Sequence, residues 1–211
     1  MKLTVFGPTG GTGAQIVCQA LAADHHVTAI ARRARAVGIT HPNLSVVEAD
    51  VLDPAWHGKG IDGADAVLSA LGTQAMRQAT TIYSQGTTAI ITAMARNDVT
   101  RFVGISAIPL TPNRDKSLLE RHVVHPLLHH FFGGGYDDMR RMERILADSQ
   151  ITWTIFRPAR LTDGPRTGRY RTAYDVRLPR AWSISRADLA SAMLAAINDT
   201  TLYQRAVAIA K

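Results

Sequence analysis

Short apolar runs alternate with longer stretches of helical periodicity through most of the chain. The apolar runs are rich in residues that favour strands, and they fall at positions 3–6, 26–30, 44–47, 66–70, 101–105 and 152–156. Helical patterns follow residue 13 (with Ile16, Val17, Ala20 and Leu21), extend from about 80 to 95, and open again at 185–188. Strands that alternate with helices at this spacing predict a mainly parallel sheet with helices on both faces.

The segment between the fifth and sixth predicted strands is less regular. Residues 117–132 carry paired apolar residues at near-helical spacing, which Pro126 interrupts. We expect the glycines at 133–135 to end that stretch and a new helix to begin near Asp137, because the carboxylates of Asp137 and Asp138 suit a helix N-terminus.

The sequence shows no internal repeat, linker or low-complexity segment. We therefore predict a single NAD(P)-binding domain over residues 1–211. The stretch from 157 to 182 is rich in Pro, Gly and Arg, as surface loops often are. We assign the substrate side mainly to residues 107–135 and 157–183, including a small C-terminal region.

The most informative motif is the loop Gly7-Pro8-Thr9-Gly10-Gly11-Thr12-Gly13, which joins the first strand to the first helix. Gly7 permits a tight turn, Gly10 lets a pyrophosphate approach bare backbone, and Gly13 allows the helix to pack closely on the strand. The helix N-terminus adds free N–H groups and a positive dipole end. In this strand–turn–helix context the loop predicts a dinucleotide-binding, Rossmann-type doubly wound α/β fold.

The second strand ends in Ile30-Ala31-Arg32-Arg33. An NAD-specific domain would place a carboxylate here to bind the ribose hydroxyls, whereas arginine pairs with the 2′-phosphate of NADP. We therefore predict NADP(H) as the cofactor. The alternative is that both arginines are solvated loop residues.

Composition refines this picture only slightly. The formal charge is +7, from 24 Lys and Arg against 17 acids, and the basic residues are scattered. A phosphorylated cofactor and ordinary surface charge explain this excess, so we do not expect a nucleic-acid partner. No apolar run approaches the roughly 18 residues of a membrane span, so we expect no membrane association. The single cysteine, Cys18, rules out an internal disulfide and fits a cytoplasmic location, and its place in the first helix predicts a buried, inert thiol.

Further segments stand at the spacings of a known family. They are 31–33, 49–53, 63–67, 71–73, 101–107, 156–159 and 184–189, in addition to the glycine loop. Together they resemble the atypical short-chain dehydrogenases/reductases with NmrA-like NAD(P)H-binding domains, and within that group the flavin reductase/biliverdin-IXβ reductase-like branch. The resemblance covers nearly the whole chain.

This resemblance implies a set of cofactor contacts. The pyrophosphate would be wrapped by Thr9, Gly10, Thr12 and Gly13, with Gly7 and Gly11 in the same loop, and the 2′-phosphate would face Arg32 and Arg33. The adenine would lie between Asp50 and Val51, and the ribose above Ala70, Leu71 and Gly72. The nicotinamide would lie beside Ser106, and its carboxamide would meet the backbone of Pro158 and Ala159. Ser106 also follows from position, because ligands bind at the carboxyl ends of strands in open α/β sheets.

Catalytic residues are harder to assign. Typical short-chain dehydrogenases use a Tyr with a Lys four residues later, and the nearest match is Tyr136 with Arg140. Arginine is not a proton-relay lysine, and Tyr136 directly follows three glycines, so it could lie at the helix entrance. We take Ser106 and Tyr136 as the candidate catalytic residues, with a packing role as the alternative for Tyr136. Hydride transfer to a flavin requires chiefly alignment over the nicotinamide.

Two other groups of residues carry candidate chemistry. Arg160, Arg166, Arg169 and Tyr170 follow a strand end and could bind an acidic or aromatic substrate, or could belong to a solvated lid. His122, His125, His129 and His130 suggest a metal site, but no carboxylate or cysteine stands nearby at ligand spacing. We predict a polar helix face there and no metal.

These features favour an NADPH-dependent oxidoreductase that transfers hydride to a flavin, quinone or related conjugated acceptor. The alternative is a redox sensor that binds NADP without turnover, as in NmrA-type regulators. An epimerase-like enzyme is disfavoured because the substrate portion is short and the Tyr–Lys pair is absent. The sequence leaves open whether the protein is a monomer or a homodimer.

Overall fold

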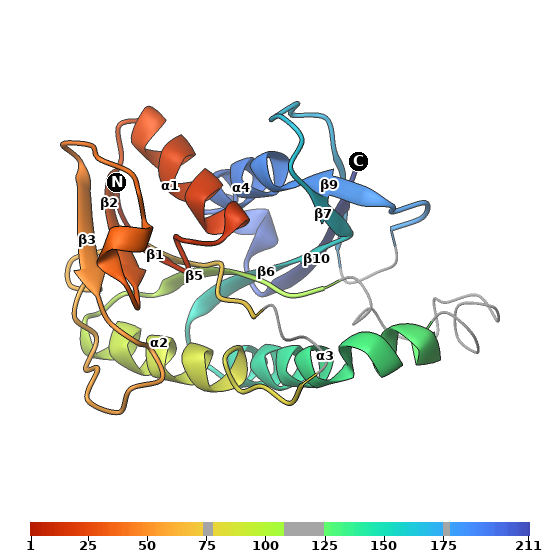
Figure 1. Cartoon of the computed structure of the whole chain (residues 1–211), viewed down its shortest axis with the longest axis horizontal. Helices are drawn as coiled ribbons and strands as arrows, with labels where there is room; N and C mark the ends of the chain where they lie inside the picture. Colours follow the sequence, from red (N-terminus) through yellow and green to blue (C-terminus); the bar gives the residue numbers. More distant parts are fainter. Residues whose placement is uncertain (74–77, 108–124, 175–177) are drawn as a thin grey trace.

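Eight strands form the central sheet of the computed structural model, which describes residues 1–73, 78–107, 125–174 and 178–211, and only the backbone of 125–133 (Figure 1). Their order is β3-β2-β1-β4-β5-β6-β10-β8. The strands are β1 (Lys2–Phe6), β2 (His26–Ala31), β3 (Leu44–Glu48), β4 (Ala66–Ser69), β5 (Arg101–Ile105), β6 (Thr152–Pro158), β8 (Arg171–Tyr174) and β10 (Arg205–Ala210). All neighbours pair in parallel except β8, which runs antiparallel to β10 at the edge. The predicted doubly wound, mainly parallel sheet is therefore confirmed.

The strand order changes direction between the neighbouring strands β1 and β4. From β1 it moves outward to β2 and β3, then returns to lay β4 on the other side of β1. Such a switch point opens a crevice at the carboxyl ends of the two strands, which is where open α/β sheets bind ligands. The glycine loop follows β1 at this point.

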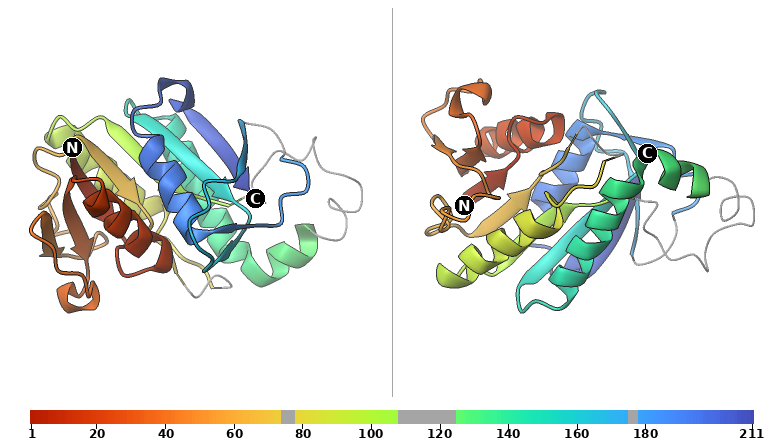
Figure 2. Two further views of the ribbon diagram at one scale, coloured as in Figure 1. Left: turned by 90° about the horizontal axis from the view of Figure 1, so that it is seen from above. Right: turned by 60° about the horizontal axis from the view of Figure 1, so that its bottom comes forward.

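Two pairs of helices cover the sheet. Helices α1 (Gly11–Ala22) and α4 (Arg186–Ala195) pack together on one face, and α2 (Ser84–Arg96) and α3 (His125–Ala147) pack together on the other (Figure 2). The alternation of strand side chains produces two cores, because Leu3 and Val5 point toward the first pair while Phe6 lies in the core of the second. Helix α1 buries Ile16, Val17, Ala20 and Leu21, as its pattern predicts.

The prediction of a helix break at residues 133–135 is wrong. Helix α3 runs without interruption from His125 to Ala147, with Pro126 in its first turn, where proline is tolerated. A side chain at Gly134 would overlap the backbone carbonyl of Gln78, so this glycine permits close packing and does not end the helix. The predicted stretch from 117 to 124 lies outside the described residues.

The two acids thought to cap a new helix have other partners. Asp138 is fully buried, and its carboxylate accepts hydrogen bonds from the backbone N–H groups of Tyr83 (2.9 Å) and Ser84 (3.3 Å) and from the Ser84 hydroxyl. It therefore caps the start of α2, a different helix. Asp137 pairs with Arg140 on its own helix, at 2.7 Å.

The structure adds elements that the periodicity did not reveal. Besides β8 and β10, a small parallel pair joins β7 (Arg160–Thr162) to β9 (Ser183–Ser185), and short 3-10 helices span Ala34–Ala36 and Thr200–Leu202. The prediction of a buried Cys18 is also wrong. Its side chain is exposed, because the buried face of α1 is formed by Ile16, Val17 and Ala20, and Cys18 lies away from that face.

Candidate functional site: the carboxyl edge of the sheet

The glycine loop is held by contacts that only glycine allows. Gly7 has a φ of +73°, and a Cβ on it would stand 2.5 Å from the carbonyl oxygen of Ala70. A Cβ on Gly13 would overlap the carbonyl of Gly7. The loop after β1 is therefore packed, backbone against backbone, on the start of α1 and on the loop after β4.

The exposed part of this loop forms a cradle of backbone groups. Thr9, Gly10 and Gly11 are exposed, and Thr12 is buried. Helix α1 begins after Gly10 with no acidic residue in its first turn and, among the described residues, no side-chain cap. Its first N–H groups are thus not occupied by a side-chain cap, as an anion site at a helix N-terminus requires.

The other residues expected at the cofactor follow the carboxyl ends of successive strands. Ala70, Leu71 and Gly72 follow β4, Ser106 follows β5, and Pro158 ends β6. The Ser106 N–H donates to the carbonyl of Phe156 at 2.8 Å, which places Ser106 beside the last residues of β6. The structure therefore brings the predicted pyrophosphate, ribose and nicotinamide residues to one edge of the sheet, in strand order.

Ser106 has an unusual environment. The residue is 3% exposed, and its Oγ has no hydrogen-bond partner among the described residues. Buried hydroxyl groups are nearly always hydrogen-bonded, so this hydroxyl, as far as the described residues go, is available to a ligand at this edge of the sheet. The neighbouring Ala159 N–H already donates to the carbonyl of Ile209 at 3.1 Å, so it is not free for a carboxamide.

Tyr136 lies on α3 and not at the helix entrance. Burial raises the pKa of its phenol, so it stays protonated at neutral pH. It packs against the core under β4 and β5, close enough to Tyr83 for its charge to help raise the pKa of that second, buried phenol. The backbone of Thr73 hydrogen-bonds to Tyr83, which ties this pair of tyrosines to the end of the loop after β4.

At the end of the site predicted for the adenosine, Arg32 and Arg33 are both exposed after β2. The Asp50 carboxylate accepts the N–H of Leu52 at 3.0 Å and so closes a local turn. Val51 is buried, and its side chain lies next to Gly86 of α2. Val51 also lines a groove of about 400 Å³ between residues 51–57 and α2.

A carboxylate that sequence reasoning missed lies at this end as well. Glu48 is level with Ala31 in the sheet, and its Oε2 accepts the N–H of Ala34 at 2.8 Å. No carboxylate follows β2 in the sequence, but Glu48 of the neighbouring strand β3 places one beside the end of β2. Only the pairing register between β2 and β3 could have revealed it.

Of the residues predicted for the substrate side, Arg160, Arg166 and Arg169 are exposed, whereas Tyr170 is partly buried against the core beneath α1 and α4. Burial raises the pKa of Tyr170. These residues lie in or beside the segment that follows β7.

That segment is anchored to α4 by Asp188. Its carboxylate accepts the N–H groups of Thr167 (2.7 Å) and Gly168 (2.8 Å) and the Thr167 hydroxyl (2.8 Å). Burial by itself raises the pKa of Asp188, but these hydrogen bonds and one with Ser185 outweigh it and lower the pKa. The segment is thus fastened to α4 at residues 167–168.

A second residue that the sequence did not single out is Arg186, the first residue of α4. Its side chain lies over Gly11, and its guanidinium pairs with Asp163 at 2.6 Å. The sequence signal was present, because arginine is an unusual choice for the first turn of a helix.

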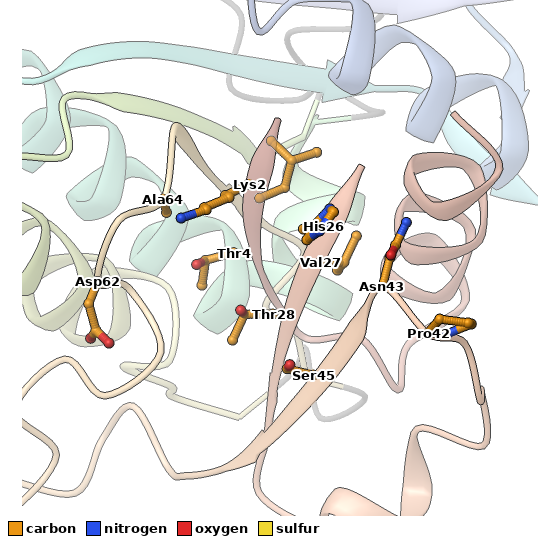
Figure 3. Close-up of a pocket in the computed structure, with 11 residues that line it drawn as sticks. Lys2, Thr4, His26, Val27, Thr28, Pro42, Asn43, Ser45, Asp62 and Ala64 are labelled. Carbon is orange, nitrogen blue, oxygen red and sulfur yellow. The ribbon is translucent and has the colours of Figure 1, made fainter. Parts of the chain in front are cut away.

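A separate hollow of about 220 Å³ lies at the opposite, amino edge of the sheet (Figure 3). Thr4, Thr28 and Ser45 stand in one row across its floor, because they are register partners on β1, β2 and β3. None of the predicted site residues lies here, so this hollow is distinct from the cofactor edge.

Of the four histidines, His122 lies outside the described residues, and His125, His129 and His130 lie in the first turns of α3. The described part of the chain contains no helix with the length and apolar character to cross a membrane.

These features define a dinucleotide-binding protein of the Rossmann class. A family model for NAD(P)H-binding proteins matches residues 7–200, and the chain belongs to this family. The expected NmrA-like NAD(P)-binding family is thereby confirmed.

Solved structures share the whole fold. An exported-protein candidate from Burkholderia pseudomallei is 26% identical, with a TM-score of 0.82 and all of both chains covered. A short-chain dehydrogenase/reductase from Veillonella parvula, crystallised with NADP, is 19% identical, with a TM-score of 0.79, covering 100% of this chain and 94% of that one. An NADH-flavin reductase candidate from Streptococcus pneumoniae is 21% identical, with a TM-score of 0.78, covering 100% and 99%.

Proposed function

We propose that the protein is an NADPH-dependent oxidoreductase that reduces a flat conjugated acceptor such as a flavin or a quinone. The observation that carries this proposal is the buried hydroxyl of Ser106, which has no hydrogen-bond partner among the described residues. It lies beside the end of β6, at the edge of the sheet that also carries the glycine loop. A purely structural serine would have a hydrogen-bond partner. The name of the Streptococcus pneumoniae neighbour supports the choice of acceptor.

The residues of the chain fit the cofactor. The bare backbone at Gly10 and Gly11 and the uncapped N-terminus of α1 suit a pyrophosphate. When bound, the nicotinamide supplies the hydride, and the protein supplies orientation. Ser106 would orient the nicotinamide or the acceptor through its hydroxyl, and Pro158 would form the wall beside it. Tyr136, protonated because its pKa is raised, can donate a hydrogen bond or a proton but cannot act as a base at neutral pH.

NADP is favoured over NAD by the two exposed arginines after β2, Arg32 and Arg33. The Veillonella parvula neighbour that was crystallised with NADP supports the same choice. Glu48 weighs against it, because its carboxylate occupies the N–H of Ala34 next to these arginines and would repel a 2′-phosphate. We infer a net preference for NADP, since the two positive charges of Arg32 and Arg33 outnumber the one negative charge of Glu48.

One observation keeps the sensor alternative in view. Arg140 stands where a typical short-chain dehydrogenase has its catalytic lysine, and it binds Asp137 on its own helix. The chain therefore offers no proton relay at this position. A protein that binds NADPH and reduces nothing would be a redox sensor.

The test is to mix the purified protein with NADPH and each of FMN, FAD, a quinone and biliverdin, and to follow the absorbance of the reduced nicotinamide. We expect turnover with at least one acceptor and a fall of about tenfold or more for Ser106→Ala. Ser45→Ala, the same change at the opposite edge of the sheet, is the matched control and should retain full activity. Tight NADPH binding without turnover of any acceptor would favour the sensor, and no NADPH binding would refute both functions.

A further inference from the structure

The side chain of Arg186 lies directly over the first turn of α1. A Cβ on Gly11 would stand 2.6 Å from Cδ and 3.0 Å from Nε of Arg186. Only the missing side chain at Gly11 leaves room for this arginine. Gly11 therefore has two effects: it leaves the backbone of the loop bare, and it makes room for the side chain of Arg186 from α4.

The positive charge of Arg186 lies where two helix dipoles disfavour it. As the first residue of α4, capped by Ser185, it stands at the positive end of its own helix dipole. It also lies at the positive end of α1. Both helix dipoles disfavour a cation at this position, and an anion beside it offsets that effect.

The anion that accompanies it in this structure is a weak partner. Asp163 Oδ1 lies 2.6 Å from Arg186 Nη1, but the Asp163 side chain is 87% exposed whereas that of Arg186 is 30% exposed. Ion pairs with a solvated carboxylate contribute little free energy, because water competes for both groups. A pyrophosphate carries more negative charge and presents several oxygens to the planar guanidinium.

We propose that Arg186 binds the pyrophosphate of the cofactor and that Asp163 is its partner only in the free protein. This inference rests on the proposed cofactor site and adds to it a residue and a mechanism. Binding of the cofactor exchanges the Arg186–Asp163 ion pair for an Arg186–phosphate contact.

The exchange reaches the acceptor side of the molecule. Asp163 begins the segment that Asp188 fastens at Thr167 and Gly168. When Arg186 turns to the phosphate, residues 163–166 lose one attachment while 167–168 keep theirs. Arg186 thus connects occupation of the cofactor site with the conformation of the segment that carries Arg166.

The first test measures dissociation constants of NADPH and NADH by titration, without any turnover. Arg186→Met keeps an apolar stem over Gly11 and removes the charge, and we expect it to weaken both cofactors by about ten- to hundredfold. Arg32→Gln is the matched control, because it removes an arginine that would contact only the 2′-phosphate and should weaken NADPH alone. Arg186→Lys keeps the positive charge without the planar guanidinium, so its dissociation constants should fall between those of Arg186→Met and the parent.

The second test uses Asp163→Asn in two backgrounds. With Arg186 present, we expect NADPH to bind about two- to fivefold more tightly, because the competing partner is lost. In the Arg186→Met background, the same change should have no effect. A double-mutant cycle isolates this coupling from a general effect of removing a negative charge.

The outcomes separate the two levels of the proposal. A parent protein that binds neither NADPH nor NADH overturns the proposed function. A parent that binds both, with Arg186→Met binding equally well and melting at the same temperature, overturns only the role of Arg186. Tighter binding of Asp163→Asn in both backgrounds would show simple repulsion and overturn the partner exchange.

Discussion

The carboxylate of Asp138 on α3 caps the backbone N–H of Tyr83 at the start of α2, 55 residues earlier in the chain. A single buried side chain thus joins the two helices that cover one face of the sheet. Because Tyr83 also contacts the loop after β4 through Thr73, Asp138 indirectly positions that loop.

Asp138→Ala should destabilise the protein strongly. The change leaves two backbone N–H groups and the Ser84 hydroxyl buried without an acceptor, which we expect to lower the free energy of unfolding by about 2–4 kcal/mol. Urea unfolding measures this loss. Asp137→Ala is the matched control on the same helix, and because its ion pair with Arg140 is exposed, its cost should stay below about 1 kcal/mol. Equal effects of the two substitutions would contradict the capping role.

Two glycines of one loop should respond differently to alanine. A Cβ on Gly13 would overlap the carbonyl of Gly7, whereas a Cβ on Gly10 would lie 3.5 Å from that oxygen, an ordinary contact. Gly13→Ala should therefore lower the free energy of unfolding by about 1–3 kcal/mol. Gly10→Ala should unfold like the parent but bind NADPH more weakly, because its methyl group would stand where the pyrophosphate is proposed to bind. Thermal unfolding and cofactor titration on both variants check this contrast.

Cofactor choice should depend on Glu48 as well as on the arginines. Glu48→Gln removes a negative charge but keeps an oxygen that can accept the Ala34 N–H, so the fold should be unchanged. We expect NADPH to bind about two- to fivefold more tightly with NADH little affected, as loss of an exposed repulsion allows. Ratios of the two dissociation constants measure the effect. An unchanged ratio would show that the 2′-phosphate lies away from this carboxylate.

Acid should loosen the segment that Asp188 fastens. Because the pKa of Asp188 is lower in the folded than in the unfolded chain, its contribution to stability is fully present above the unfolded value of about 4 and is lost as the pH falls through the folded value. Asp188→Asn should cost about 1–2 kcal/mol at neutral pH. The difference between parent and variant in unfolding free energy should stay constant from about pH 5 to 8 and shrink below about pH 4. A difference that grows with acid would contradict this assignment.

The central fold follows from local patterns because the strands in the middle of the sheet, β1, β4 and β5, are buried along most of their length. The runs that became β1 to β6 are apolar and bounded by turn residues, so periodicity locates them well. Helix α3 shows where such reasoning fails. Glycine in a sequence suggests a helix end, but Gly134 is needed because the backbone at Gln78 packs against it. A contact between residues so distant in sequence leaves no local signal.

The residues of the candidate site also fall into those that the sequence predicts and those that it misses. The glycine loop, Arg32 and Ser106 are recognisable because strand ends and charge choices are encoded locally. Glu48 and Arg186 were missed because each acts on a neighbour from another strand or helix. The role of Glu48 depends on the pairing register of β2 and β3, which a single sequence does not display. The role of Arg186 depends on the packing of α4 against α1, for which an arginine in the first turn of a helix was only a weak local sign.

The strand order has a practical consequence for engineering. All the residues proposed to bind the adenosine and pyrophosphate, apart from Arg186, precede residue 74, whereas the residues proposed for the nicotinamide and acceptor side, from Ser106 onward, all follow α2. On the proposed assignment, nucleotide preference and acceptor preference would therefore be separable traits encoded by different halves of the gene. A chimera joined within α2 would exchange one trait while inheriting the other, provided that the donor of the second half supplies an arginine to lie over Gly11.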